Sequence, residues 1–342
     1  MVTVTIGLMG FGRIGRNLFR ILYDRSDVRI GVISDIADPE ALTYLLRFDT
    51  LLGRFPDLVS YKDGYLYSVG KEFPFIQGAD PGDVDWRAYG VDYVVEATGR
   101  DRPRDQLLKH MACGARRVLL CVPPADPPDR SIVYGVNHDQ LQPGDRIISN
   151  ASCTAHCAAP ILRVLNDVFG VAHAHLSVVH AFSSIQRLAD VPADELRLSR
   201  AAAENIVPAD TNAGHVLDSV LPELAGRVSA TALRVPVANG SIVDMTIWFE
   251  RDISVERINE VMRTAAAGPY RHVLEYAADP IVSSDVIGSH FSSVFDSLAT
   301  MALGARQAKI IAWFDNSWAY TNRLVDLIRH CAEQDEHMGR QQ

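Results

Sequence analysis

A cysteine near the middle of the chain lies in a context that favours nucleophilic chemistry. Cys153 follows Ser152 at the predicted start of a helix. A thiolate in the first turn of a helix is stabilised by the helix dipole and by backbone N–H groups that have no partner within the helix. His180, at the end of a predicted strand, is the candidate general acid–base for this thiol. The pair predicts covalent catalysis by a cysteine nucleophile.

A glycine-rich segment near the start of the chain matches the phosphate-binding turn of dinucleotide-binding domains. It lies between a predicted strand and a predicted helix and consists of Gly10, Phe11, Gly12, Arg13, Ile14 and Gly15. The glycines allow a tight turn, the approach of a pyrophosphate, and close packing of helix on strand. Asp35, 20 residues after Gly15, would bind the adenosine ribose and repel the additional phosphate of NADP. The pattern predicts that the turn binds NAD. The alternatives are a glycine-rich turn that binds no ligand, and an Asp35 that only caps a helix or a turn.

Three residues of the cysteine segment also have the spacing of metal ligands. Cys153, His156 and Cys157 lie at i, i+3 and i+4 and would share one helix face. A zinc site needs a fourth ligand at a recognisable spacing, and we find none in the sequence. We therefore predict no metal site and expect Cys157 to be a packing residue.

The elements that must position these residues change in character near Asn150. Apolar runs and amphipathic stretches alternate before it, with predicted strands at 2–7, 28–34, 91–96 and 117–122. This alternation predicts an α/β fold with a doubly wound parallel sheet of the Rossmann type. After it, a predicted helix at 154–169 precedes longer β-rich segments at 173–182 and 230–250, the latter with a turn at 238–240. Long antiparallel strands of this kind predict an α+β domain.

These changes predict two domains. We place an NAD-binding domain at 1–150 and a catalytic domain at 151–316, and we expect a final helix at 317–342 to pack back on the first. Asn316 could cap that helix. Its predicted apolar face comprises Leu324, Val325, Ile328 and Cys331.

Composition excludes several other classes of protein. The 342 residues carry a net charge of −9, which disfavours binding to nucleic acid or to anionic lipid. No apolar run approaches the roughly 20 residues of a membrane-spanning helix, and the N-terminus does not resemble a signal peptide. The five cysteines are scattered and odd in number, so we expect a reducing, cytoplasmic location.

Five motifs carry a resemblance to a known family. In chain order they are GFGRIGRN (10–17), SNASCTAHCAAP (149–160), VVHAF (178–182), RVPVAN (234–239) and WFDNSWAYTNR (313–323). In order and spacing they resemble the phosphorylating glyceraldehyde-3-phosphate dehydrogenase family over nearly the whole chain. The resemblance implies a Rossmann domain, a catalytic domain with a mixed sheet, NAD as the cofactor, and a homotetramer.

The resemblance implies oxidation of a phosphorylated aldehyde through a thioester. Cys153 would attack the aldehyde, and His180 would take the hydroxyl proton of the thiohemiacetal while hydride passes to NAD. The backbone N–H of Cys153 and the His180 side chain would stabilise the oxyanion. Inorganic phosphate would then open the thioester.

The resemblance also assigns binding residues. Asn316 would bind the nicotinamide carboxamide, Tyr320 would pack beside the ring, and the loop with Val191-Pro192 would reach the cofactor of a neighbouring subunit. Further cofactor-binding residues would be Thr98, Gly99 and Cys121. The residues that would bind substrate or inorganic phosphate are Ser152, Thr154, Ser183, Thr211, Asn212 and Arg234.

The chain departs from the family pattern mainly at these binding positions. Ile185 replaces a threonine that holds the substrate phosphate, and Asn212 replaces a glycine of the inorganic-phosphate site. Met9 replaces an asparagine in the first turn, and Cys121 replaces a serine near the nicotinamide. A lost hydrogen bond to a charged group costs about 1.5–3 kcal/mol, which is enough to change the preferred aldehyde.

Three functions remain open from the sequence. The first is NAD-dependent oxidative phosphorylation of glyceraldehyde 3-phosphate or a related aldehyde. The second is an erythrose-4-phosphate-type dehydrogenase that hydrolyses the thioester, because the segments 196–211 and 132–141 resemble that enzyme. The third is a non-catalytic NAD-binding sensor, which retention of Cys153 with His180 disfavours.

Overall fold

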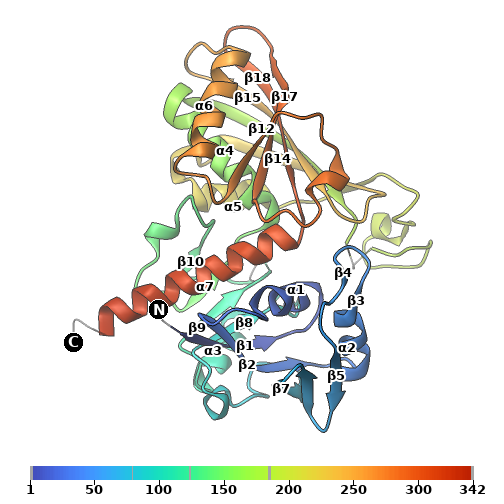
Figure 1. The fold of residues 1–342 in the computed structure, drawn as a ribbon. Helices are drawn as coiled ribbons and strands as arrows, with labels where there is room; N and C mark the ends of the chain where they lie inside the picture. The colour runs from blue at the N-terminus through green and yellow to red at the C-terminus, as the bar shows by residue number, and fades with distance from the viewer. Residues whose placement is uncertain (1–2, 79, 123–124, 184–185, 340–342) are drawn as a thin grey trace. The chain divides into compact units, whose positions relative to one another are not determined.

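A computed structural model describes residues 3–78, 80–122, 125–183 and 186–339 of the chain. The chain divides into two compact units (Figure 1). The first contains Met1–Ile132, His138–Ala151 and Thr321–Gln342, and the second contains Val133–Asn137 and Ser152–Tyr320. The first unit therefore takes its residues from both ends of the chain.

The first unit is built on a largely parallel sheet. Its strand order is β10-β11-β9-β8-β1-β2-β7-β6-β5, and all neighbours from β10 to β7 run parallel. Only the β5, β6 and β7 pairs at one edge are antiparallel. The strands are β1 (Val4–Met9), β2 (Val28–Asp35), β5 (Val59–Lys62), β6 (Tyr65–Ser68), β7 (Lys71–Gln77), β8 (Tyr93–Glu96), β9 (Arg117–Leu120), β10 (Arg130–Ser131) and β11 (Ile147–Ser149). The predicted doubly wound parallel sheet is confirmed.

Helices and one small hairpin complete this unit. The hairpin pairs β3 (Phe48–Asp49) with β4 (Gly53–Arg54). The helices are α1 (Arg13–Leu22), α2 (Pro39–Arg47), α3 (Arg104–Ala112) and most of α7 (Trp318–Gly339). The predicted apolar face of α7 is buried, and it joins Ile6 and Leu8 of β1 and Leu18 of α1 in one apolar cluster. Burial of this face, more than helix propensity, stabilises α7 in its position.

The start of α7 differs from the expectation that Asn316 caps it. Asp315 supplies the cap, because its Oδ1 accepts hydrogen bonds from the backbone N–H groups of Ser317 (2.8 Å) and Trp318 (2.7 Å). The Asn316 side chain is instead bound to Ser241. A carboxylate at a helix N-terminus is favoured by the helix dipole as well as by the hydrogen bonds.

The second unit is built on a mixed sheet. Its strand order is β13-β14-β12-β15-β18-β17-β16. The pairs β12–β14 and β16–β17 are parallel, and the other neighbours are antiparallel. The strands are β12 (Val171–Ala181), β13 (Val207–Ala209), β14 (Val228–Val235), β15 (Ser241–Phe249), β16 (Leu274–Ala277), β17 (Ser293–Ala302) and β18 (Gln307–Phe314). The predicted α+β class with a mixed sheet is confirmed.

Three helices pack on this sheet among the residues that the structure describes. They are α4 (Cys153–Phe169), α5 (Ala213–Val220) and α6 (Val255–Ala267). Helix α4 contains Pro160 and buries nearly all of its length, including Cys157, Ile161 and Leu165. Its first turn, with Cys153, is thereby held firmly by packing further along the helix.

The turn between β14 and β15 depends on Gly240. Its φ is +82°, a left-handed conformation that costs little only for glycine. A Cβ at this position would also collide with the carbonyl oxygen of Ser283. The turn leads directly into Ser241 and so fixes where β15 begins.

We expect Gly240→Ala to lower the free energy of unfolding by about 3 kcal/mol or more, because backbone strain and a steric collision act together. Gly226→Ala is the matched control: its φ is +73°, but a Cβ there would meet no atom within 4 Å, so about 1 kcal/mol is expected. Urea denaturation of both variants measures the difference. Equal losses would show that the contact with Ser283 relaxes without cost.

Candidate active site

The local structure before Cys153 presents this residue at the first position of α4. Ser152 caps the helix, since its Oγ accepts a hydrogen bond from the backbone N–H of Ala155 at 3.1 Å. Ala151, two residues before Cys153, has a φ of +49°, which is uncommon for a residue with a side chain. Strained backbone of this kind often occurs beside functional residues.

His180 lies beside this cysteine in the second unit. Its Nε2 is 3.7 Å from the Sγ of Cys153. Its Nδ1 is 2.6 Å from the carbonyl oxygen of Ala181, which can only accept a hydrogen bond, so Nδ1 carries the proton. In the neutral imidazole Nε2 then presents its lone pair toward the thiol. This is the geometry that a general base for Cys153 requires.

The ionisation of the pair differs from the expectation of a stabilised thiolate. Burial raises the pKa of the Cys153 thiol, and this effect outweighs the opposing effects of Arg234 and Thr154. Burial, together with the positive charge of Arg234, lowers the pKa of His180 to about 4. Both groups are therefore neutral near pH 7. The helix N-terminus alone does not overcome the cost of burying a charge.

The cysteine and the histidine line a pocket of about 460 Å³. The parallel register of β12 and β14 places Arg234 opposite His180. Other predicted substrate-binding residues in the lining are Ser152, Thr154, Thr211 and Asn212. Ser183 does not line this pocket, and Ile185 lies outside the described residues.

The pocket has four further lining residues that were not predicted from the sequence, namely Val178, Asp210, His215 and Ala232. Val178 and Ala232 are two residues before His180 and Arg234, and their positions follow from the alternation of side chains along a strand. His215 is three residues after Asn212 and shares its side of α5. Asp210 directly precedes Thr211, and no pattern in the sequence singles it out.

Asn316, two residues after the end of β18, contacts His180. Its Nδ2 lies 3.1 Å from Nδ1 and 3.5 Å from Nε2 of His180. Tyr320 is buried and meets the ring of His156 edge-on, with 5.8 Å between ring centroids. The Val191-Pro192 loop has no such contact with the pocket, and Val191 is exposed.

The glycine turn of the first unit has the shape that a pyrophosphate requires. Gly10 has a φ of +99°, and a Cβ there would come within 2.6 Å of the backbone of Ala97 and Thr98. A Cβ on Gly12 would meet no atom within 4 Å, so open space lies over the backbone at this position. The first turn of α1 has no side-chain cap and no acidic residue. These residues fit the phosphates of NAD.

Asp35 is attached to this turn. Its Oδ2 accepts a hydrogen bond from the backbone N–H of Phe11 at 2.5 Å, and its Oδ1 accepts one from that of Ala37 at 2.8 Å. The carboxylate therefore lies at the carboxyl end of β2, beside the glycine turn. Arg13 and Ile14 follow the glycine turn as the first two residues of α1.

The other predicted cofactor residues of this unit surround the end of β8. Thr98 donates its backbone N–H and its hydroxyl to the buried carboxylate of Glu96, and Gly99 follows in the same loop. Glu96 also pairs with Arg102 (3.3 Å) and accepts from Cys121 N–H through its carbonyl. Met9, a departure from the family pattern, points into an apolar cluster.

Two alternative sites receive no support from the geometry. Cys157 lies against Ser293 and the carbonyl of Trp313, and no cluster of metal-ligating side chains occurs in the part of the chain that the structure describes.

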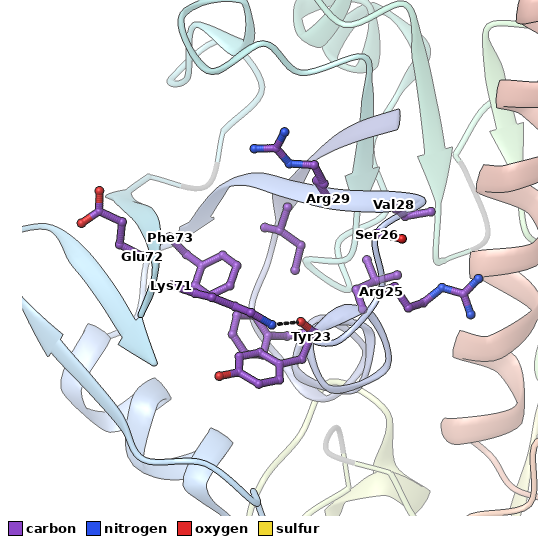
Figure 2. A pocket seen from close by; sticks show the side chains of 11 residues that line it. Tyr23, Arg25, Ser26, Val28, Arg29, Lys71, Glu72 and Phe73 are labelled. Atoms are coloured by element: carbon purple, nitrogen blue, oxygen red, sulfur yellow. Dashed lines mark hydrogen bonds between the residues drawn. The ribbon is translucent and has the colours of Figure 1, made fainter. Parts of the chain in front are cut away.

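A second pocket, of about 350 Å³, lies beside β2 in the first unit (Figure 2). Lys71 bonds to the carbonyl of Tyr23 there, and the lining offers no cysteine or histidine as a nucleophile–base pair.

No helix within the described ranges combines the length and the apolar character that crossing a bilayer demands.

Comparison with known proteins places both units in one family. Residues 4–103 match the NAD-binding domain of glyceraldehyde 3-phosphate dehydrogenase, and residues 152–316 match its C-terminal domain. The glyceraldehyde-3-phosphate dehydrogenase of Mycobacterium leprae is 43% identical over 334 residues, which cover 96% of this chain and 98% of the relative. That of Geobacillus stearothermophilus is 40% identical over 332 residues, covering 97% and 99%. That of Streptomyces coelicolor is 41% identical, covering 95% and 98%.

The matched regions contain the glycine turn with Asp35 in the first unit and the Cys153–His180 pocket in the second. The family relation and the cysteine–histidine pair argue together for an enzyme and against a non-catalytic sensor. The chain belongs to the glyceraldehyde-3-phosphate dehydrogenase family and is an NAD-dependent aldehyde dehydrogenase of that type.

Proposed function

We propose that the protein oxidises a phosphorylated aldehyde through a thioester on Cys153. The observation that carries this proposal is the 3.7 Å contact between Cys153 Sγ and His180 Nε2, in a pocket that also contains the guanidinium of Arg234. A nucleophile beside a base gives covalent chemistry, and a half-buried arginine favours an anionic substrate.

The roles of the residues follow from their protonation states. As Sγ attacks the aldehyde carbon, its proton passes to Nε2 of His180, which then donates this proton to the carbonyl oxygen to complete the thiohemiacetal. His180 then removes the hydroxyl proton as the carbon is oxidised to the thioester. NAD, when bound, supplies the acceptor for the hydride. Residues proposed to hold it are the glycine turn, Asp35, Asn316 and Tyr320.

Two acyl acceptors are open for the second half of the reaction. In the first candidate, inorganic phosphate binds the hydroxyls of Ser152, Thr154 and Thr211 and opens the thioester. In the second, water does so and a free acid is released. The presence of Asp210 in the lining favours the second candidate, because its carboxylate repels a phosphate dianion in the same pocket.

The decisive experiment is NADH formation by the purified protein with glyceraldehyde 3-phosphate or erythrose 4-phosphate, with and without inorganic phosphate. Phosphate-dependent turnover supports the first candidate. Phosphate-independent turnover with a free acid as product, identified by ³¹P NMR, supports the second. Absence of NADH with every short phosphorylated aldehyde, while Cys153 reacts with iodoacetamide, would reject both.

We expect Arg234→Met to raise the KM for the phosphorylated aldehyde by about a hundredfold, because a charge-assisted hydrogen bond to the phosphate is lost. The matched control is unphosphorylated glyceraldehyde, whose kcat/KM should change less than about threefold. Steady-state kinetics with both aldehydes measure the effect. An equal loss for both would assign Arg234 to the chemistry of the thiol instead of the substrate phosphate.

We also propose a homotetramer in the cytoplasm. The loop around Val191 supports the assembly, because Leu188, Val191 and Leu196 expose 70%, 45% and 84% of their surface in the isolated chain. Exposed apolar side chains on one loop are typical of a subunit interface. Sedimentation velocity tests the proposal, and a stable monomer at micromolar concentration would reject it.

A further inference from the structure

A buried serine holds the side chain of Asn316. Ser241, the first residue of β15, is 0% exposed. Its Oγ accepts a hydrogen bond from the backbone N–H of Ala181 at 3.0 Å. The same hydroxyl lies 2.7 Å from the Oδ1 of Asn316 and donates to it. Ser241 therefore joins the residue after His180 to the amide that faces His180.

The hydrogen-bond inventory assigns the orientation of this amide. A serine hydroxyl has one proton to donate, and the N–H of Ala181 already acts as donor toward Oγ. If Asn316 turned its NH2 toward Ser241, the buried hydroxyl proton would lose its acceptor, and an unsatisfied buried donor is unfavourable. The NH2 group is accordingly directed at His180, and Oδ1 at Ser241.

The backbone of Asn316 is fixed separately. Its N–H donates to Oδ1 of Asn239 at 2.9 Å, and Nδ2 of Asn239 donates to Asp315 at 2.8 Å. The other oxygen of Asp315 caps α7. The main chain therefore stays in place whatever the side chain does, so that Ser241 controls the orientation of the amide alone.

We propose that Ser241 is a positioning residue that turns the NH2 group of Asn316 into the active site. When NAD binds, Asn316 then offers a hydrogen-bond donor to the carbonyl oxygen of its carboxamide. This inference rests on the proposed role of Asn316 in binding the nicotinamide.

Two NAD analogues test the orientation without any substitution. The acetylpyridine analogue keeps the carbonyl oxygen and lacks the NH2, whereas the thionicotinamide analogue keeps the NH2 and replaces the oxygen by sulfur, a weak acceptor. Calorimetry with the wild-type enzyme should give a Kd for the acetylpyridine analogue within about threefold of that for NAD, and one about tenfold higher for the thio analogue. The reverse order would show that Oδ1 faces the cofactor and would overturn the inference.

A substitution then tests Ser241 itself. Ser241→Ala should raise the Kd for NAD about tenfold and abolish the discrimination between the two analogues, with Cys153 alkylation in the absence of NAD unchanged. Ser241→Cys, which keeps a weak donor, should restore part of the discrimination. Ser297→Ala is the matched control, because Ser297 is buried in the same sheet and donates only to the carbonyl of Ala277. It should leave all three Kd values unchanged.

The outcomes separate this inference from the proposed function. A folded Ser241→Ala variant that bound NAD as tightly as the wild type and still discriminated between the two analogues would reject the role of Ser241. NADH formation by the wild-type enzyme would still support the proposed function. Failure of the wild-type enzyme to bind NAD would reject both. If Ser241→Ala does not fold, Ser241→Cys decides, because a weaker donor at the same position should reduce the discrimination between the analogues, and unchanged discrimination would reject the role of Ser241.

Discussion

Replacing Cys153 with serine is expected to lower the rate of NADH formation by roughly four orders of magnitude. A serine hydroxyl is a far weaker nucleophile than a thiol and forms no thioester. His180 Nε2, which lies 3.7 Å from Sγ, cannot compensate for that chemical difference. The Kd for NAD should stay within about twofold of the wild-type value, because the glycine turn and Asp35 belong to the first unit.

A second cysteine variant controls for general effects of thiol removal. Cys113 lies in the first unit, with its Sγ near the carbonyl of Gly82, and Cys113→Ser should retain full activity. Mass spectrometry after iodoacetamide treatment should show Cys153 modified in this variant and in the wild type. If Cys153→Ser kept more than a tenth of the wild-type rate, oxidation would not proceed through this thiol.

Replacing His180 with asparagine is expected to lower kcat by about a thousandfold, because a positioned general base contributes roughly 10²–10⁴ in rate. Alkylation of Cys153 should also slow, since burial raises the pKa of the thiol and its proton then has no acceptor at Nε2. In both proteins the alkylation rate should rise with pH as the thiolate fraction grows. Stopped-flow measurements of NADH and timed alkylation give the two rates.

The same substitution should change how stability depends on pH. The pKa of His180 is lowered to about 4 in the folded protein, whereas an unfolded histidine titrates near about 6.5. Between these values the unfolded chain binds the additional proton, so the free energy of unfolding falls as the pH is lowered from about 6.5 toward 4. At pH 5 this contribution is about 2 kcal/mol, and His180→Asn should lack it.

His175→Asn is the control for both measurements. His175 lies on the same strand but bonds to Ser229 and Thr231 on the sheet surface. Its replacement should leave kcat and alkylation unchanged, and the fall of stability between pH 7 and pH 5 should match the wild type. If both variants lost kcat and alkylation rate to the same extent, the cause would be a disturbance of strand β12 and not the loss of the His180 imidazole.

The regular elements could be predicted from the sequence because their apolar patterns are local. The period of the apolar residues in α7 predicted the buried face of Leu324, Val325, Ile328 and Cys331, and all four are buried. The segment 28–34 was predicted as a strand and is β2 with one additional residue. The proximity of Cys153 and His180 was predicted in the same way, from a helix start and a strand end.

The pairing of strands could not be predicted in this way. Nothing local indicates that β12 pairs in parallel with β14, yet this register places Arg234 opposite His180. Asp210 and His215 enter the pocket because α5 and the segment before it lie beside β14. Contacts between residues far apart in sequence depend on tertiary packing, which a pattern of residue types does not encode.

The ionisation of Cys153 depends on a second effect that the sequence does not show. The position at a helix N-terminus is visible in the sequence, but the depth of burial is not. In the folded protein desolvation dominates and raises the pKa of the thiol. The helix dipole, worth about 0.3–1 kcal/mol at exposed sites, is too small to offset the loss of hydration.

The composition of the first unit has a consequence for protein synthesis. Its apolar core includes Leu324 and Ile328 of α7, which are synthesised long after β1 and α1. A nascent chain that ends before Thr321 therefore exposes apolar surface of the sheet that α7 covers in the finished protein. Ribosome-bound chains of increasing length should recruit chaperones throughout translation and should bind NAD only after the final helix has emerged.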